Sequence, residues 1–103
     1  MNERDLQGGV IETARLLGYR VAHFRPARTQ NGWATPVAAD GKGYPDLTLC
    51  RPGRLVFAEL KVGRNKPTVD QAAWLQALEA AGAEAYLWTD LDYTAGTIEQ
   101  ALR

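Results

Sequence analysis

The stretch "LVFAELK" (residues 55–61) ends a run of apolar residues with a carboxylate and an ammonium. Because side chains alternate across a strand, Glu59 and Lys61 point to the same face. A tight hairpin can return the preceding strand beside this one, so that Asp46, which opens that strand, lies near Glu59. Two carboxylates held close together suit Mg²⁺, and a lysine beside them completes a set that can hydrolyse a phosphodiester.

Each member of this set would have a separate chemical task. A bound metal polarises the phosphate and lowers the pKa of a coordinated water, while the ammonium orients that water or stabilises charge on the phosphorane. The alternative interpretation is a simple ion pair on a solvent-facing strand. The site is favoured by a combination of features: Pro45-Asp46 at a strand start, twelve intervening residues with a hairpin turn, and Glu59-x-Lys61 on the returning strand.

The elements that must position these residues follow from periodicity and capping signals. Apolar residues at helical spacing predict a first helix, and Thr68-x-x-Gln71 has the spacing of a capping box at the start of a second. Alternating and apolar runs predict strands, two of them joined by a Pro-Gly turn. The predicted order α-β-β-β-α-β-α comprises a helix at 3–17, strands at 19–24, 46–50 and 54–62, a helix from Thr68 to Gly82, a strand at 83–88 and a short helix at 98–102.

Residues 26–44 form a long segment with two prolines, three glycines and no clear period. Long loops in compact domains tend to be functional, and this one is either a short hairpin around Gly32 or an arm that orders on a partner. Its cations and aromatic rings suit phosphate and base contacts, although packing of Trp33 on the core is an equally good interpretation. The candidate DNA contacts are Arg25, Arg28, Lys42, Trp33 and Tyr44, to which the "GRNKP" segment adds Arg64 and Lys66.

Length and composition fit one globular domain spanning residues 1–103. The net charge is zero, but the charges are segregated along the chain. Residues 1–67 hold 11 Lys+Arg and 6 Asp+Glu, a net +5, whereas residues 68–103 hold 1 and 6, a net −5. This asymmetry is either a chance imbalance or a basic surface that faces phosphates.

The chain has one cysteine and one histidine, which limits disulfide and zinc chemistry. Cys50 is the only cysteine, which excludes an internal disulfide, and we expect a buried thiol in a reducing compartment. His23 is the only histidine, and we expect it to be structural because no zinc set is available. The N-terminus has no apolar leader and no run has the length of a membrane span, so a cytoplasmic location is expected.

Several motifs together resemble the PD-(D/E)xK nuclease superfamily, and specifically its small stand-alone VRR-Nuc domains of phages and bacteria. The likeness extends over nearly the whole chain and implies an α/β, restriction-endonuclease-like αβββαβ core with a central mixed sheet flanked by helices. The motifs are "E-x-x-L-Q" at Glu3 to Gln7, "LGYRVAHFRPART", "GYPDL", "ELK", "Q-x-x-W-L-x-x-L-x-x-x-G" from Gln71 to Gly82, and "YLW".

The resemblance also implies roles for individual residues. Asp46 and Glu59 correspond to Mg²⁺ ligands, with the carbonyl of Leu60 as a third ligand, Lys61 as the catalytic lysine, and Mn²⁺ as a possible substitute metal. A glutamate of the first helix, Glu3 or as a weaker choice Glu12, corresponds to a further ligand, but a first-turn acid that complements the helix dipole is an alternative for Glu3. Gln71 corresponds to a glutamine that supports the site, a role compatible with capping.

The same resemblance implies a substrate and an assembly. Stand-alone members act as homodimers that nick four-way DNA junctions, which suits two-fold symmetry because such a junction offers two equivalent scissile phosphates. The modest net charge disfavours tight non-specific duplex binding. Two alternatives remain open: a sequence-specific or homing-type nickase, and a catalytically silent DNA-binding module of the same fold.

Overall fold

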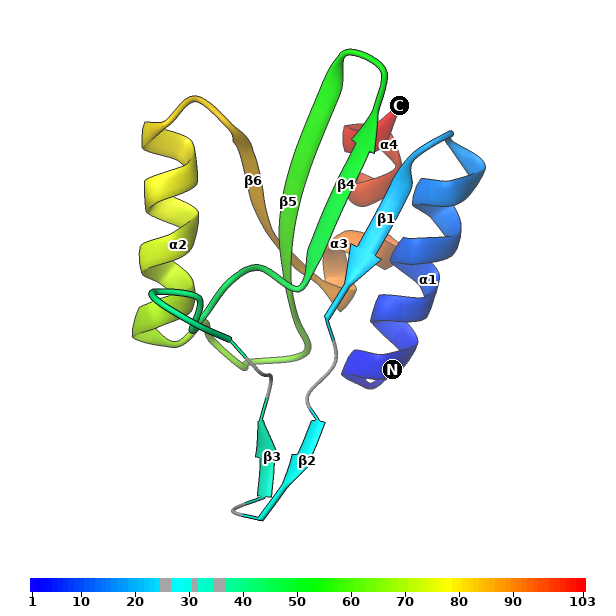
Figure 1. Ribbon diagram of the computed structural model, residues 1–103. Helices are drawn as coiled ribbons and strands as arrows, with labels where there is room; N and C mark the ends of the chain where they lie inside the picture. Colours follow the sequence, from blue (N-terminus) through cyan, green and yellow to red (C-terminus); the bar gives the residue numbers. More distant parts are fainter. Residues whose placement is uncertain (25–26, 31, 35–36) are drawn as a thin grey trace.

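The computed structural model describes residues 1–24, 27–30, 32–34 and 37–103. The predicted order of helices and strands is present, with two additions. The hairpin β2–β3 occupies part of the long loop, and a short helix, α3, follows the last strand (Figure 1). The elements are α1 (Glu3–Leu16), β1 (Arg20–His23), β2 (Ala27–Thr29), β3 (Gly32–Ala34), β4 (Leu47–Arg51), β5 (Arg54–Lys61), α2 (Val69–Ala80), β6 (Glu84–Thr89), α3 (Asp90–Thr94) and α4 (Thr97–Leu102).

Helix α3 was not predicted because its five residues are too few to show a helical period. Its start nevertheless carries a capping box, in which Thr89 and Asp92 exchange hydrogen bonds between side chain and backbone. The signal was present in the sequence as Thr-x-x-Asp.

The central sheet has the strand order β1-β4-β5-β6. Strand β4 is antiparallel to both of its neighbours, β1 and β5, whereas β6 runs parallel to β5. A parallel neighbour needs a crossover connection, and α2 provides it between β5 and β6. The mixed sheet with helices on its sides confirms the predicted α/β class.

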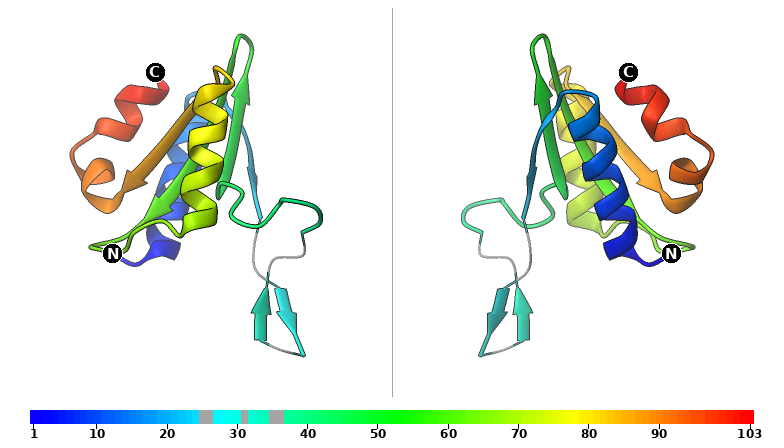
Figure 2. Two further views of the ribbon diagram at one scale, coloured as in Figure 1. Left: turned by 90° about the vertical axis from the view of Figure 1, so that its left-hand side faces the viewer. Right: turned by 90° about the vertical axis from the view of Figure 1, so that its right-hand side faces the viewer.

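One face of the sheet forms the core. Alternate residues of β5, namely Val56, Ala58 and Leu60, are fully buried against α1 and the C-terminal helices, which lie together behind the sheet in Figure 1. The views from the sides show α2 next to β6 and away from these helices (Figure 2). The remaining core residues are Leu6, Val10, Ala14, Tyr19, Leu47, Leu49, Trp88, Ile98 and Leu102.

The other face of the sheet is covered less completely, because no residue of α2 is fully buried. At the hairpin end of this face, Leu55 is 50% exposed. Cys50, which pairs with Leu55 across β4 and β5, is also exposed. The prediction of a buried thiol was therefore wrong: Leu47 and Leu49 alternate toward the core, so Cys50 points to the open face.

No helix in the described part of the chain is long and apolar enough to cross a membrane.

Candidate active site

The register of β4 and β5 places Asp46 beside Glu59. Leu47 pairs with Ala58, so the residue before β4 lies at the level of the residue after Ala58 on β5. The backbone N–H of Leu60 donates a hydrogen bond to Oδ2 of Asp46, at 2.8 Å. Because this donor belongs to the sheet backbone, it holds the Asp46 carboxylate at the edge where β4 begins and β5 ends.

Glu59 is the buried charged residue of this edge. Its side chain is 1% exposed, and neither carboxylate oxygen receives a hydrogen bond from the described residues. Nζ of Lys61 lies 3.9 Å from Oε2 of Glu59, which is within range for an ion pair but too long for a hydrogen bond. A buried carboxylate without donors is costly, so this arrangement is one that a stability role alone does not explain.

The surroundings raise the pKa of Glu59 to about 9. Burial is the largest cause, followed by the neighbouring Asp46 carboxylate, and Lys61 offsets only part of the effect. Without a bound cation, Glu59 therefore favours its neutral, protonated form.

This donor set fits Mg²⁺. The two carboxylates are hard oxygen ligands, and the unpartnered oxygens of Glu59 are the positions that a cation would satisfy. Across residues 1–24, 27–30, 32–34 and 37–103, no group of three or more His, Cys, Asp or Glu side chains is close enough to hold a metal. Magnesium is commonly held by one or two carboxylates together with waters and substrate phosphates, so a pair is sufficient.

Of the two candidate glutamates in α1, only Glu3 acts on this edge. Its negative charge contributes to the raised pKa of Glu59, whereas Glu12 is exposed and has no such effect among the causes. Glu3 is also a first-turn acid, in a helix capped by a reciprocal pair of hydrogen bonds between Asn2 and Asp5. The structure confirms Glu3 as a first-turn acid, and its role as a metal ligand stays a prediction. Within the described residues, Glu3 does not form a group of three close acids with Asp46 and Glu59.

Gln71 forms the predicted capping box. Its Oε1 accepts a hydrogen bond from the Thr68 N–H at 2.9 Å, and its own N–H donates to Oγ1 of Thr68 at 3.2 Å. The side-chain oxygen is thus committed to the start of α2. A role of Gln71 in supporting the site stays a prediction.

The segment 37–45 connects α2 to the site. Gly43 has a φ of +86°, and a Cβ there would lie 2.7 Å from Cβ of Asp70, so only glycine allows this close approach to the first turn of α2. Nε1 of Trp74 donates to the carbonyl of Asp40 at 2.9 Å. These contacts hold the segment 37–45 against α2, and the segment leads directly into Asp46.

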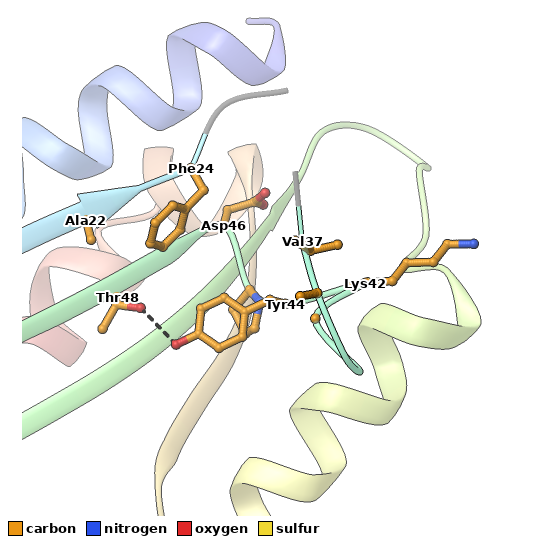
Figure 3. Close-up of a pocket in the computed structure, with 11 residues that line it drawn as sticks. Ala22, Phe24, Val37, Lys42, Tyr44, Asp46 and Thr48 are labelled. Carbon is orange, nitrogen blue, oxygen red and sulfur yellow. Dashed lines mark hydrogen bonds between the residues drawn. The ribbon is translucent and has the colours of Figure 1, made fainter. Parts of the chain in front are cut away.

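A pocket of about 840 Å³ lies beside the carboxylate pair, on the open face of the sheet. Figure 3 shows Phe24, Val37 and Tyr44 around it, with Asp46 at its rim. Phe24 is 56% exposed and was not predicted as a site residue. The sequence feature that could have indicated it is the alternation of residues 19–24, which puts Phe24 on the face of the strand opposite to Val21 and His23. The described lining residues are Ala22, Phe24, Val37, Ala38, Gly41, Lys42, Gly43, Tyr44, Pro45, Asp46 and Thr48.

The predicted DNA contacts are placed only in part. Lys42 is 85% exposed and pairs with Asp70 at 3.6 Å, and Arg64 and Lys66 are exposed in the turn that follows β5. Arg25 and the side chains of Arg28 and Trp33 lie outside the described residues. Lys42 therefore lies at the first turn of α2, and Arg64 and Lys66 follow Lys61 in the chain.

Comparison with known proteins agrees with this architecture. No family model and no curated protein matches the sequence. A solved structure described as a VRR_NUC domain matches with a TM-score of 0.67 and 21% sequence identity, over 92% of this chain and 92% of that chain. At this level of identity the likeness is one of fold, and it agrees with the motifs "GYPDL" and "ELK" in the sequence. This chain therefore has the fold of a VRR-Nuc domain.

Proposed function

We propose that this protein is a metal-dependent DNA endonuclease that hydrolyses phosphodiester bonds. The observation that carries the proposal is Glu59, whose carboxylate is 1% exposed and receives no hydrogen bond from the described part of the chain, while Asp46 and Lys61 flank it. A fold maintains such an arrangement at a cost, and a cation between two carboxylates removes that cost.

Asp46 and Glu59 are the proposed Mg²⁺ ligands, with the Leu60 carbonyl as a third. The N–H of Leu60 orients Asp46, which limits the positions that its free oxygen can take. When bound, Mg²⁺ or Mn²⁺ supplies polarisation of the phosphate and a lowered pKa of a coordinated water. Glu3 is placed to add negative charge at the edge rather than as a close ligand.

Lys61 is the proposed catalytic cation. Its side chain is 14% exposed, and its Nζ lies 3.9 Å from Oε2 of Glu59. The ammonium is therefore close to the carboxylate of Glu59 without donating a hydrogen bond to it. From there it orients the attacking water or stabilises charge that develops on the phosphorane. Gln71 supports the start of α2, against which the segment before Asp46 packs.

Branched DNA, in particular a four-way junction, is the proposed substrate, with a homodimer as the active form. A C₂ pair of sites matches the two equivalent strands of a junction. The exposed cations Lys42, Arg64 and Lys66 supply phosphate contacts around the edge. Arg25 and Arg28 are further candidates.

The test is cleavage of labelled four-way junction, flap, single-stranded and plain duplex DNA with Mg²⁺, Mn²⁺ or EDTA. We expect cleavage that EDTA abolishes and that Asp46→Asn or Lys61→Ala lowers by about 100-fold or more. Arg15→Ala, an exposed cation at the far end of α1, is the matched control and should cut normally. Paired symmetric nicks in the four-way junction, together with a dimer by light scattering, would support a dimeric Holliday junction resolvase. Undiminished cleavage by both site variants would refute the assignment.

A further inference from the structure

We infer that the pocket beside Asp46 receives an unpaired nucleobase of the DNA strand that is cut. This inference rests on the proposed nuclease function and narrows its substrate to DNA with an unstacked nucleotide next to the scissile phosphate. Phe24 and Tyr44 are the residues assigned to contact the base.

The position of the pocket limits what can occupy it. Asp46 belongs both to the carboxylate pair and to the pocket rim (Figure 3). A group inside the pocket is therefore adjacent to a phosphate held at Glu59 and Lys61. In a nucleic acid, the group attached next to a backbone phosphate is a sugar with its base. The volume of about 840 Å³ lies within the ~300–1,000 Å³ range of small-ligand pockets, so a nucleoside can enter.

The walls of the pocket suit a base. Phe24 is 56% exposed, although its ring already makes an edge contact with Tyr44, at 6.3 Å between centroids and 75° between planes. More than half of the Phe24 side chain is thus exposed at the pocket, where a base of any sequence can stack on its ring. Ala22 and Val37 provide apolar contact on either side.

Two hydroxyl groups, of Tyr44 and Thr48, add a polar point to the largely apolar lining of the pocket. The hydroxyl oxygens of Tyr44 and Thr48 lie 3.3 Å apart and both can donate or accept a hydrogen bond. Tyr44 itself is fixed by edge contacts with Phe57 at 6.2 Å and Trp74 at 5.1 Å. Tyr44 is therefore held in place before a ligand binds, which lowers the entropy cost of binding.

The charges around the pocket match the backbone of a strand whose base lies inside. Lys42 extends outward from the pocket with an 85% exposed side chain (Figure 3), and Lys61 lies 3.9 Å from Glu59, the neighbour of the lining residue Asp46. Cations near an aromatic wall are the arrangement that single-strand binding uses. An apolar side chain of a protein partner would not need them.

The test compares two oligonucleotides of about twelve nucleotides with the same charge, one of thymidine and one in which every base is absent. Binding is measured by fluorescence anisotropy in Ca²⁺, a hard-ligand cation, with a gel to verify that the strands stay intact. We expect wild type to prefer the thymidine strand. Phe24→Ala should weaken thymidine binding by about 5- to 100-fold and leave binding of the base-free strand unchanged.

Two variants make the result specific. Phe24→Tyr keeps an aromatic face and should keep the preference for bases. Leu55→Ala removes a 50% exposed side chain from the hairpin end of the same sheet face and should change neither affinity. Equal binding of both strands by wild type, or equal weakening of both by Phe24→Ala, would overturn the inference. A dimer that dissociates in Phe24→Ala would assign the pocket to a second copy and overturn it as well.

Cleavage with Mg²⁺ separates this inference from the proposed function. DNA cleavage by wild type without any preference for bases would refute the pocket assignment and leave the nuclease intact. A preference for bases without cleavage in Mg²⁺ or Mn²⁺ would refute the nuclease function and, with it, the assignment of the base to a cut strand.

Discussion

Replacement of Glu59 by glutamine should stabilise the protein in the absence of divalent metal. The change removes a charge from a side chain that is 1% exposed and has no hydrogen-bond donor among the residues that the structure describes, and it preserves the shape of the side chain. A buried ionised carboxylate lowers the stability of the fold, whereas a neutral amide does not carry this charge.

The expected size follows from the pKa of Glu59, which burial and Asp46 raise to about 9. A folded-state pKa above the unfolded value means that the folded state holds its proton longer, so wild type loses stability as pH rises from about 4.5 toward 9. The loss is about 1.4 kcal/mol for each pH unit, which gives up to ~4 kcal/mol between about pH 5 and pH 8. Allowing for water that reaches the ionised pair, we expect about 2 to 4 kcal/mol.

The assay is urea unfolding of wild type and Glu59→Gln between about pH 5 and pH 8 in EDTA. The difference in unfolding free energy between the two proteins should grow with pH, because any constant cost of the amide cancels. Glu84→Gln is the matched control: Arg54 holds the pKa of Glu84 at about 2, so its difference from wild type should stay flat in this range. Mg²⁺ should then stabilise wild type and not Glu59→Gln.

A difference that stays constant from about pH 5 to pH 8 would refute the reasoning. It would mean that the Glu59 carboxylate is hydrated and ionised throughout. Burial of Glu59 would then carry no cost that a cation between Asp46 and Glu59 could remove. Stabilisation of Glu59→Gln by Mg²⁺ equal to that of wild type would place the metal elsewhere.

Three further predictions concern the scaffold. Glu84→Gln removes the negative charge and one of the two oxygens that accept hydrogen bonds of 2.8 Å from Arg54. After solvent screening it should cost about 1 kcal/mol near neutral pH, and urea unfolding should show this cost disappear as pH falls from about 4.5 toward 2, because only the ionised form is stabilised. Gly43→Ala should lower the melting temperature more than Gly63→Ala, because both positions have positive φ but only Gly43 abuts α2. Equal shifts would contradict the proposed close approach. Tyr19→Phe removes a buried hydroxyl that donates to the Leu102 carbonyl and accepts from Arg54, and should cost about 1 to 3 kcal/mol in chemical denaturation; an unchanged midpoint would contradict it.

Much of the fold was predictable because local signals decide it. The Thr68–Gln71 capping box, the alternation of residues 19–24 and the turn between β4 and β5 each depend on neighbours a few residues apart. The order of elements followed from them, whereas the expectation of a mixed sheet came from the resemblance to VRR-Nuc domains. The pairing of Glu59 and Lys61 was likewise predictable, since residues two apart in a strand share a face.

What the tertiary structure decided depends on contacts between distant segments. Sequence alone left the register of β4 and β5 open, and a slip of one residue would have turned Asp46 away from Glu59. Cys50 was misjudged because an apolar run does not show which face a helix covers.

The sequence by itself determined the residues that could hold a metal and the elements that carry them, because side-chain chemistry and strand alternation are local properties. Only the tertiary structure decided that Glu59 is buried without a donor from residues 1–24, 27–30, 32–34 and 37–103, and that a pocket opens beside Asp46. Burial and cavities are properties of packed surfaces, and the pocket forms where Phe24, at the end of β1, meets Tyr44 of a segment that is held by α2.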